Sequence, residues 1–292
     1  MAGKSKSSNA PTNGGPRPKS MNWLLVVVAI ALVATVSYAV ERKGAPRPAA
    51  ASSAPIPVPT AVMDDLTTIP APVWEQAGTT NAAVPVFVGL ADTTAGKPMV
   101  LYIGSLFCPY CAAARWSVVA ALSRFGTFSG LSYSASSSSD VFPSTATLSF
   151  YGGRYTSQFL DFQAVELQGA ELVGTQYPTL ETPTDEQERL IRKYDGPPYL
   201  SKEAAGGIPF MLVGGRYMWS GSPYNPGVLA GLSHETIAAT LPKGTGNAAD
   251  AILANANEIT ATICAVDGQK PESVCSSPAV KAAMKALPTK TP

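Results

Sequence analysis

The stretch Ser105-Leu106-Phe107-Cys108-Pro109-Tyr110-Cys111 separates an apolar run from a helix-forming segment. The apolar run, residues 98–104 (Pro-Met-Val-Leu-Tyr-Ile-Gly), predicts a buried strand. Residues 109–125 predict a helix that Gly126 is placed to end. A Cys-x-x-Cys pair at a helix start puts both sulfurs on the first turn, close enough to form a disulfide. The stretch therefore predicts a strand, a cysteine loop and a helix in succession.

The position of each cysteine in this loop predicts a different chemical role. Cys108 is expected among the unpaired N–H groups at the positive end of the helix dipole, which stabilise a thiolate. Cys111 lies one turn inside the helix, where it is suited to resolve a mixed disulfide. We therefore expect Cys108 to be the nucleophile and Cys111 the resolving thiol. Phe107, Pro109 and Tyr110 complete the predicted active-site loop.

The same pair is open to a structural interpretation and to a metal-binding one. A purely structural bridge would gain little by closing so short a loop, because stabilisation grows with loop length. A zinc site would need Cys264 and Cys275, but ten residues separate them, unlike the spacing of zinc knuckles. We expect no metal and no cofactor. Cys264 and Cys275 instead predict a structural disulfide between two helices, with a second redox pair as the alternative.

The remaining segments of the globular part predict a mixture of strands and helices. Thr184 and Gln187 form a capping-box pattern that opens a helix. Gly214-Gly215 between two apolar runs predicts a two-residue hairpin turn. Arg115 is expected in solvent or on a polar rim, and His234 at a helix start. The expected strands are residues 131–135, 147–151, 158–167, 210–213 and 216–219, and the expected helices are residues 184–194, 248–263 and 278–287. This mixture predicts an α/β fold.

Two motifs together resemble the thioredoxin superfamily. One is Cys-Pro-Tyr-Cys followed by a helix, whose Pro-Tyr dipeptide is usual in glutaredoxins, and the other is Gly-Ile-Pro (residues 207–209) before a hairpin. The longer string from Phe107 to Trp116, continuing through residues 121–131, is similar to a thioredoxin-like group, domain-of-unknown-function family 929. The resemblance extends over roughly residues 65–287. It implies a thioredoxin-like fold and brings no established substrate.

The resemblance also implies a role for Ile208 and Pro209. In thioredoxin-like folds a cis-proline before the final hairpin faces the cysteine pair, so we expect a cis Ile208–Pro209 bond that presents the Ile208 backbone to an extended substrate. The long segment between Cys111 and Pro209 departs from glutaredoxins, and glutathione binding is not carried over. We expect a thioredoxin-like fold with an inserted β-rich segment and extra C-terminal helices, preceded by one transmembrane helix.

The N-terminal region predicts a membrane anchor. Residues 1–20 read as a basic, disordered cytoplasmic tail, and residues 21–40 as the anchor. The uncharged part from Trp23 to Val40 would span roughly 27 Å as a helix, close to the thickness of a bilayer. The alternative is a cleaved signal peptide, with Ser37 and Ala39 as the small residues before the cut. Residues 41–64 predict a Pro/Ala-rich linker and residues 65–292 the thioredoxin-like domain.

Charge and cysteine content limit the kinds of partner that the protein can bind and the compartments in which it can work. Of 21 basic and 20 acidic residues, seven basic and one acidic fall in residues 1–47, which leaves an acidic remainder without a nucleic-acid-binding surface. Two close cysteine pairs favour an oxidising compartment. We therefore expect a single-pass cell-membrane protein, N-terminus cytoplasmic, whose extracytoplasmic domain is a thiol–disulfide oxidoreductase.

The expected partners are thiol- or disulfide-containing proteins that are secreted or membrane-bound. A redox protein in the membrane is also expected, because one membrane segment cannot pass electrons across the bilayer. Oxidase, reductase and isomerase activities are all compatible with the motif. The alternative function is a non-catalytic thioredoxin-like module, in which Cys108–Cys111 is a static disulfide and the Ile208–Pro209 edge binds peptide.

Overall fold

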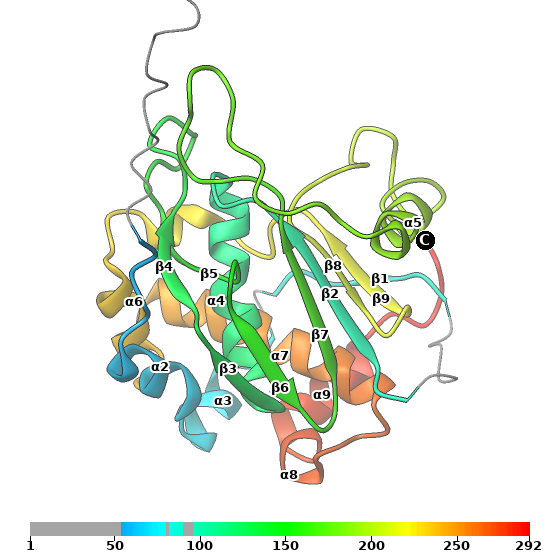
Figure 1. Ribbon diagram of the computed structural model, residues 1–292. Helices are drawn as coiled ribbons and strands as arrows, with labels where there is room; N and C mark the ends of the chain where they lie inside the picture. Colours follow the sequence, from blue (N-terminus) through cyan, green and yellow to red (C-terminus); the bar gives the residue numbers. More distant parts are fainter. Residues whose placement is uncertain (1–53, 80–81, 90–95) are drawn as a thin grey trace, which may run out of the picture. The chain divides into compact units, whose positions relative to one another are not determined.

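A computed structural model describes residues 54–79, 82–89 and 96–292. Its central sheet has five strands in the order β1-β9-β8-β2-β7 (Figure 1). β2 and β7 run parallel, whereas β8 is antiparallel to both β2 and β9, and β1 is antiparallel to β9. These strands are β1 (Val86–Phe87), β2 (Met99–Gly104), β7 (Asp161–Glu166), β8 (Phe210–Val213) and β9 (Tyr217–Ser220). The mixed sheet and its helices confirm the predicted α/β class.

Two small antiparallel sheets form between α4 (Pro109–Leu122), the helix that follows the cysteine loop, and β7. β3 (Gly126–Ser129) pairs with β6 (Arg154–Ser157), and β4 (Ser132–Ala135) pairs with β5 (Ala146–Ser149). They correspond to the β-rich segment expected from the sequence. The single strand expected over residues 158–167 is β7, which begins at Asp161, and β6 precedes it as a separate strand.

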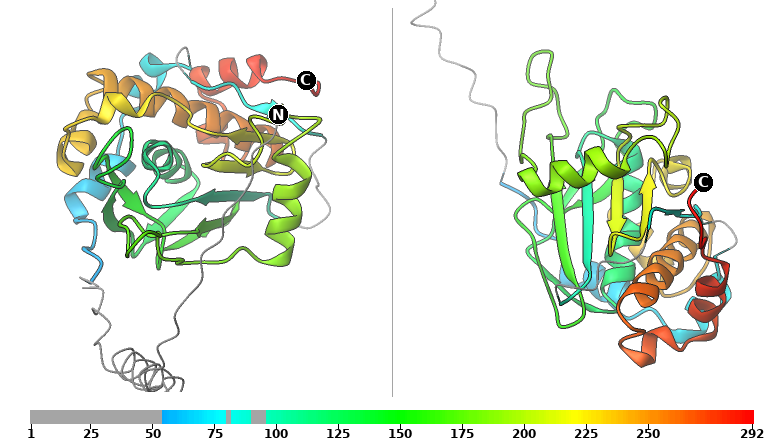
Figure 2. Two further views of the ribbon diagram at one scale, coloured as in Figure 1. Left: turned by 90° about the horizontal axis from the view of Figure 1, so that it is seen from above. Right: turned by 90° about the vertical axis from the view of Figure 1, so that its right-hand side faces the viewer.

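Helices cover both faces of the central sheet. Along β2, Val100 and Tyr102 pack into a large core shared with α4 (Pro109–Leu122) and α7 (Asn247–Val266). Leu101 and Ile103 point to the opposite face and pack into a smaller core, which α5 (Asp185–Tyr194) covers. This alternation is the two-residue period of a strand. The right-hand view of Figure 2 shows α5 crossing one face of the sheet.

The remaining helices surround α4 and α7. α2 packs on α6, and α3 and α9 pack on α7. They are α2 (Thr60–Thr67), α3 (Ala71–Ala77), α6 (His234–Thr240), α8 (Glu272–Cys275), α9 (Pro278–Ala286) and the 3-10 helix η1 (Pro226–Leu229). α4 has no solvent face: every residue except Tyr110 is buried. A helix that is apolar on all sides is expected to lie inside a domain.

Two local signals in the sequence are confirmed by the backbone. The Gln187 N–H donates to the Thr184 hydroxyl at 3.3 Å, and the Thr184 N–H donates to the Gln187 side chain at 2.9 Å, which completes the capping box of α5. Gly214 and Gly215 have φ values of 56° and 63°, the left-handed conformation that a two-residue hairpin turn requires. Both signals act within a few residues, so they needed no tertiary information.

The predicted tail and anchor, residues 1–20 and 21–40, lie outside the described residues. Within the part of the chain that the structure describes, no helix has both the length and the apolar character needed to cross a membrane. The folded part begins earlier than the predicted boundary at residue 65, because α2 starts at Thr60 and buries Val62 and Leu66. The end of the predicted linker therefore belongs to the domain.

Candidate active site

The junction of β2 and α4 places Cys108 at the start of a helix. β2 ends at Gly104, and α4 begins at Pro109 with Cys108 as its N-cap residue. The Cys111 N–H donates a hydrogen bond to the Cys108 Sγ, 3.3 Å away. Pro109 occupies the first helical position, where its missing N–H leaves no helical bond unmade. The helix end thus directs a backbone donor and positive partial charge at one sulfur.

The two thiols differ in burial and in acidity. Both cysteines are free; Cys108 is 5% exposed and Cys111 is fully buried. A hydrogen bond with the Cys111 side chain lowers the pKa of Cys108 below its ordinary value, although burial acts in the opposite direction. Burial raises the pKa of Cys111 well above its ordinary value. Cys108 is therefore the sulfur more readily ionised and more readily reached, although most of its surface is covered.

Ile208 and Pro209 lie beside Cys108. The Cys108 thiol is 3.9 Å from the Ile208 carbonyl oxygen, its hydrogen-bond acceptor, and the Ile208–Pro209 bond is cis. The register of the sheet explains the contact, since Phe210 of β8 pairs with Ile103 of β2 just before the cysteine loop. Two other proline bonds are also cis. Pro209 therefore differs from the other two cis prolines in that the residue before it, Ile208, contacts the Cys108 thiol.

A buried ion pair lies one turn beyond Cys111. The Arg115 Nε donates to Glu166 Oε1 at 2.8 Å, and Nη2 donates to Oε2 at 2.6 Å. Nη2 also donates to the Ser105 carbonyl oxygen at 2.8 Å, which ties the pair to the cysteine loop. Glu166 is the last residue of β7 and pairs in register with Gly104, so the sheet brings its carboxylate to this end of β2.

The predicted exposed position of Arg115 is wrong, because the side chain is fully buried. α4 is enclosed on several sides: the Ser117 hydroxyl donates to Ile252 of α7, and the Thr147 hydroxyl of β5 donates to the Ala112 carbonyl. A charged side chain on such a helix needs an internal partner of opposite charge. Glu166 is that partner.

The ion pair acts on both thiols through its cation. The hydrogen bond with Cys111 is the largest cause of the lowered pKa of Cys108, and the Arg115 charge adds to it. The pKa of Cys111 stays raised by burial, which the Arg115 charge only partly offsets. Tyr102 lies against the same group, with its ring centroid 5.8 Å from the guanidinium carbon and its hydroxyl donating to the Cys111 carbonyl at 3.4 Å. A positive charge in a poorly hydrated interior favours ionised sulfur more strongly than it would in water.

Two loops from the long segment between Cys111 and Pro209 contact the residues next to the thiols. In the loop between β4 and β5, the Ser137 N–H donates to the Phe107 carbonyl at 2.8 Å, and the Phe142 ring meets Tyr110 edge to face at 6.0 Å. In the loop between β7 and α5, Tyr177 stacks on Phe107 with ring centroids 4.2 Å apart. The sequence did not indicate these contacts, because each joins segments that are distant along the chain.

Cys264 and Cys275 form the predicted disulfide, which joins the last part of α7 to α8. Both residues are 1% exposed. Their pairing leaves no second cysteine couple for a four-cysteine zinc site with Cys108 and Cys111. His234 begins α6 as expected, and its Nε2 lies 2.8 Å from the Ser134 carbonyl oxygen and 2.9 Å from that of Thr147. We assign these residues to structure.

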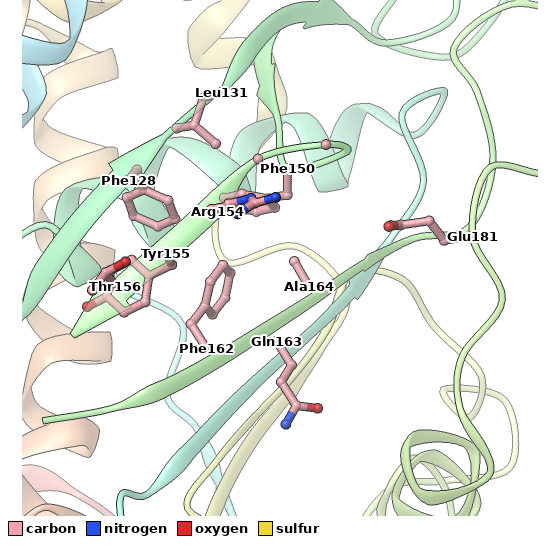
Figure 3. A pocket seen from close by; sticks show the side chains of 12 residues that line it. Phe128, Leu131, Phe150, Arg154, Tyr155, Thr156, Phe162, Gln163, Ala164 and Glu181 are labelled. Carbon is pink, nitrogen blue, oxygen red and sulfur yellow. The ribbon is translucent and has the colours of Figure 1, made fainter. Parts of the chain in front are cut away.

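A groove of about 630 Å³ opens between β6 and β7 (Figure 3). Aromatic rings form much of its wall, and Arg154 and Glu181 contribute charged groups. The groove and the ion pair share a contact, because the Phe150 N–H donates to Glu166 Oε1 at 3.3 Å. Neither Cys108 nor Cys111 lines this groove, so it is separate from the cysteine site.

Comparison with known proteins relates the chain to a protein family. A family model described as "Domain of unknown function (DUF929)" matches residues 88–265, which include Cys108, Cys111, the ion pair and Pro209. No curated protein matches the chain, and no solved structure matches it.

Proposed function

The chain belongs to the DUF929 family, and we propose that it is an extracytoplasmic thiol–disulfide oxidoreductase. Cys108 supplies the attacking sulfur and Cys111 the resolving sulfur. The observation that carries this proposal is the hydrogen bond from the Cys111 N–H to the Cys108 Sγ at the start of α4. A thiolate held in this way is the form of cysteine that attacks a disulfide.

The proposed chemistry is two successive thiol–disulfide exchanges. The Cys108 thiolate attacks one sulfur of a substrate disulfide, a mixed disulfide forms, and the other substrate sulfur leaves as a thiolate that takes a proton from water. Cys111 then loses its proton and attacks the Cys108 Sγ, which releases the second substrate thiolate. The protein ends with a Cys108–Cys111 disulfide and has given two electrons to the substrate. An oxidase runs the same steps in reverse, with a membrane redox protein as the electron acceptor.

The arrangement of elements supports a thioredoxin-like fold. β2, α4 and β7 form a parallel strand–helix–strand unit, and the β8–β9 hairpin continues the sheet beside β2. α5 packs on one face, and α4 and α7 pack on the other. The Ile208 carbonyl beside Cys108 supports the role that the resemblance implies, which is pairing with an extended substrate backbone.

The proposed compartment follows from the second cysteine pair and the N-terminal sequence. The buried Cys264–Cys275 disulfide supports an oxidising environment. The apolar residues 23–40 support a single membrane anchor with a cytoplasmic N-terminus. We therefore propose that the substrates are secreted or membrane proteins with reactive cysteines.

The reactivity of the two thiols tests this function. We expect limiting iodoacetamide at mildly acidic pH to label Cys108 of the reduced protein before Cys111, which mass mapping would show. Cys111→Ser should accumulate mixed disulfides with substrate proteins, because the resolving sulfur is missing. Cys108→Ser is the matched control and should accumulate none.

The opposite outcome would support the non-catalytic alternative. In that case a reduced Cys108–Cys111 pair would not exchange with any disulfide, and Cys111→Ser would trap nothing. Binding of unfolded peptides would nevertheless persist in Cys108→Ser. Preferential labelling of Cys111 would reverse the assigned roles while leaving the redox function in place.

A further inference from the structure

We propose that two loops around Cys108 form a docking rim for an extended polypeptide that carries apolar and basic side chains. The first rim loop is residues 136–145, between β4 and β5, and the second is residues 167–184, between β7 and α5. Both rise above the start of α4 in Figure 1. The inference rests on the proposed function, because the rim would deliver a substrate disulfide to Cys108.

Both rim loops are attached to the cysteine loop at defined points. The first is held by the hydrogen bond from Ser137 to the Phe107 carbonyl and by the contact of Phe142 with Tyr110. The second is held by a hydrogen bond of 2.8 Å from the Leu106 N–H to the Gln168 carbonyl and by the Tyr177 stack on Phe107. Phe107 and Tyr110 lie on either side of Cys108 in the chain. The loops are therefore anchored around the thiol.

Exposed apolar side chains gather on the rim. Val141 of the first rim loop is 70% exposed, and Val173 and Leu172 of the second are 57% and 45% exposed. Tyr110, between the loops, is 38% exposed. These four are the majority of the seven large apolar side chains that are exposed in the described part of the chain. Such a concentration beside a reactive group indicates a surface that a partner covers.

The charge of the rim is negative. Asp140 and Glu171 adjoin the exposed Val141 and Leu172, and neither rim loop contains a lysine or an arginine. The third acid of the rim, Glu181, is already engaged, since it accepts the Glu166 N–H at 2.7 Å. The loop before Pro209, residues 195–208, carries Lys202, Glu203 and the largely buried Asp195, so it adds no net positive charge. An anionic substrate such as glutathione disulfide is therefore disfavoured, and a basic one is favoured.

These features specify the occupant. The Ile208 carbonyl beside Cys108 provides an acceptor for an extended backbone, and the apolar loop tips provide cover for side chains on either side of the substrate cysteine. The acidic residues add a preference for lysine or arginine near that cysteine. An unfolded polypeptide segment has all three properties, whereas glutathione disulfide offers a short peptide backbone but no apolar and no basic side chain.

The test compares four disulfides and four protein variants. The substrates are an apolar peptide disulfide with flanking lysines, the same peptide with flanking glutamates, glutathione disulfide and neutral hydroxyethyl disulfide. For Val141→Asn and Val173→Asn, which remove the apolar contact without changing the charge, we expect KM for the lysine peptide to rise about tenfold with kcat unchanged, since burying one such side chain contributes more than a tenfold change requires. The rate with hydroxyethyl disulfide should not change.

Two further variants complete the design. The Asp140→Lys/Glu171→Lys double variant should reverse the preference between lysine and glutamate peptides. Ile56→Asn is the matched control: Ile56 is 65% exposed but lies outside both rim loops, where its carbonyl accepts the Tyr133 N–H of β4. It should behave like the unaltered protein with every substrate. Four of the five altered positions are solvent-exposed, and Asp140 is half-buried in a surface loop, so folding is expected to be preserved.

Three results would contradict the proposed docking rim. One is equal efficiency of glutathione disulfide and the lysine peptide in the unaltered protein. Another is an equal loss of activity toward hydroxyethyl disulfide in the rim variants, which would locate the defect at the thiols. If no disulfide reacts at all, the proposed function fails. The docking rim is then tested separately, by measuring how tightly Cys108→Ser binds the reduced lysine peptide. Weaker binding after Val141→Asn would then support the proposed rim, and unchanged binding would reject it.

Discussion

At the residue scale, Arg115 connects the packing of the core to the chemistry of the thiols. A buried ion pair is weak evidence for stability, because removing two charges from water costs about as much as their attraction returns. Arg115 and Glu166 are nevertheless both fully buried and joined by two hydrogen bonds. Because the cation favours the ionised form of both sulfurs, adding to the hydrogen bond at Cys108 and opposing burial at Cys111, its effect should be seen in their ionisation.

We predict that removing this charge raises the pKa of Cys108. Arg115→Met alone should also destabilise the fold by about 3–5 kcal/mol, because it leaves Glu166 buried without a partner. The double variant Arg115→Met/Glu166→Met should recover much of that loss and keep the raised pKa. Titration of thiolate absorbance in the double variant separates the two effects. A Cys108 pKa equal to that of the unaltered protein would show that the pair serves packing alone.

Glu258 of α7 gives a second prediction at this scale. Burial raises the pKa of its carboxyl group to about 7. The folded state therefore holds a proton more tightly than the unfolded state, whose glutamate pKa is about 4.3. The resulting stability is present below about pH 4.3 and is lost as pH rises through about 7.

We expect Glu258→Gln to remove this dependence. Urea unfolding should give a variant more stable than the unaltered protein at pH 8, by on the order of 1–2 kcal/mol once partial hydration is allowed for, and a smaller difference at pH 5. Asp267, whose pKa burial raises to about 6, is present in both proteins and cancels in the comparison. A difference that does not change with pH would contradict the assignment.

At the scale of elements, the sequence predicts those helices, strands and turns that depend only on residues close together in the chain. β2, the cysteine loop and α4 follow from one continuous stretch, and the α5 capping box and the Gly214-Gly215 turn are equally local. β1 is only two residues long and exists because it pairs with β9, so no local pattern indicates it. The Arg115–Glu166 pair was not predicted for the same reason. Its members are 51 positions apart in the chain, and only the parallel register of β2 and β7 brings them together.

The disulfide between α7 and α8 is predicted to stabilise the fold without taking part in exchange at Cys108. α8 lies at the opposite end of the domain from the start of α4 (Figure 1), so electron relay between the two cysteine pairs is not expected. Cys264→Ala/Cys275→Ala should lose about 2–3 kcal/mol of stability by the loop-entropy relation. Exchange activity at Cys108 should be retained below the lowered melting temperature. Mass mapping of a partly reduced protein that finds Cys108 or Cys111 bonded to Cys264 or Cys275 would favour a relay.

At the scale of the whole molecule, the proposed function requires the domain to meet its substrates outside the cytoplasm. The 18 residues 23–40 contain no charged residue, and four basic residues precede them. A helix of this length would span roughly 27 Å, close to the hydrocarbon thickness of a bilayer. The Pro/Ala-rich residues that follow are suited to a tether, because proline-rich chains are extended and semi-rigid.

We therefore predict that the full chain sediments with membranes and resists extraction by carbonate. Protease added to spheroplasts should release a fragment that begins within residues 41–59, while a label on the basic tail stays protected. Replacing both Val28 and Leu32 by Arg should weaken anchoring, because each charge at the bilayer centre costs about 2.5–3.5 kcal/mol on insertion scales. A soluble product whose first residue lies near Val40 would establish signal-peptide cleavage instead. Exchange at Cys108 would then take place free of the membrane, and the redox partner would have to reach the domain by diffusion.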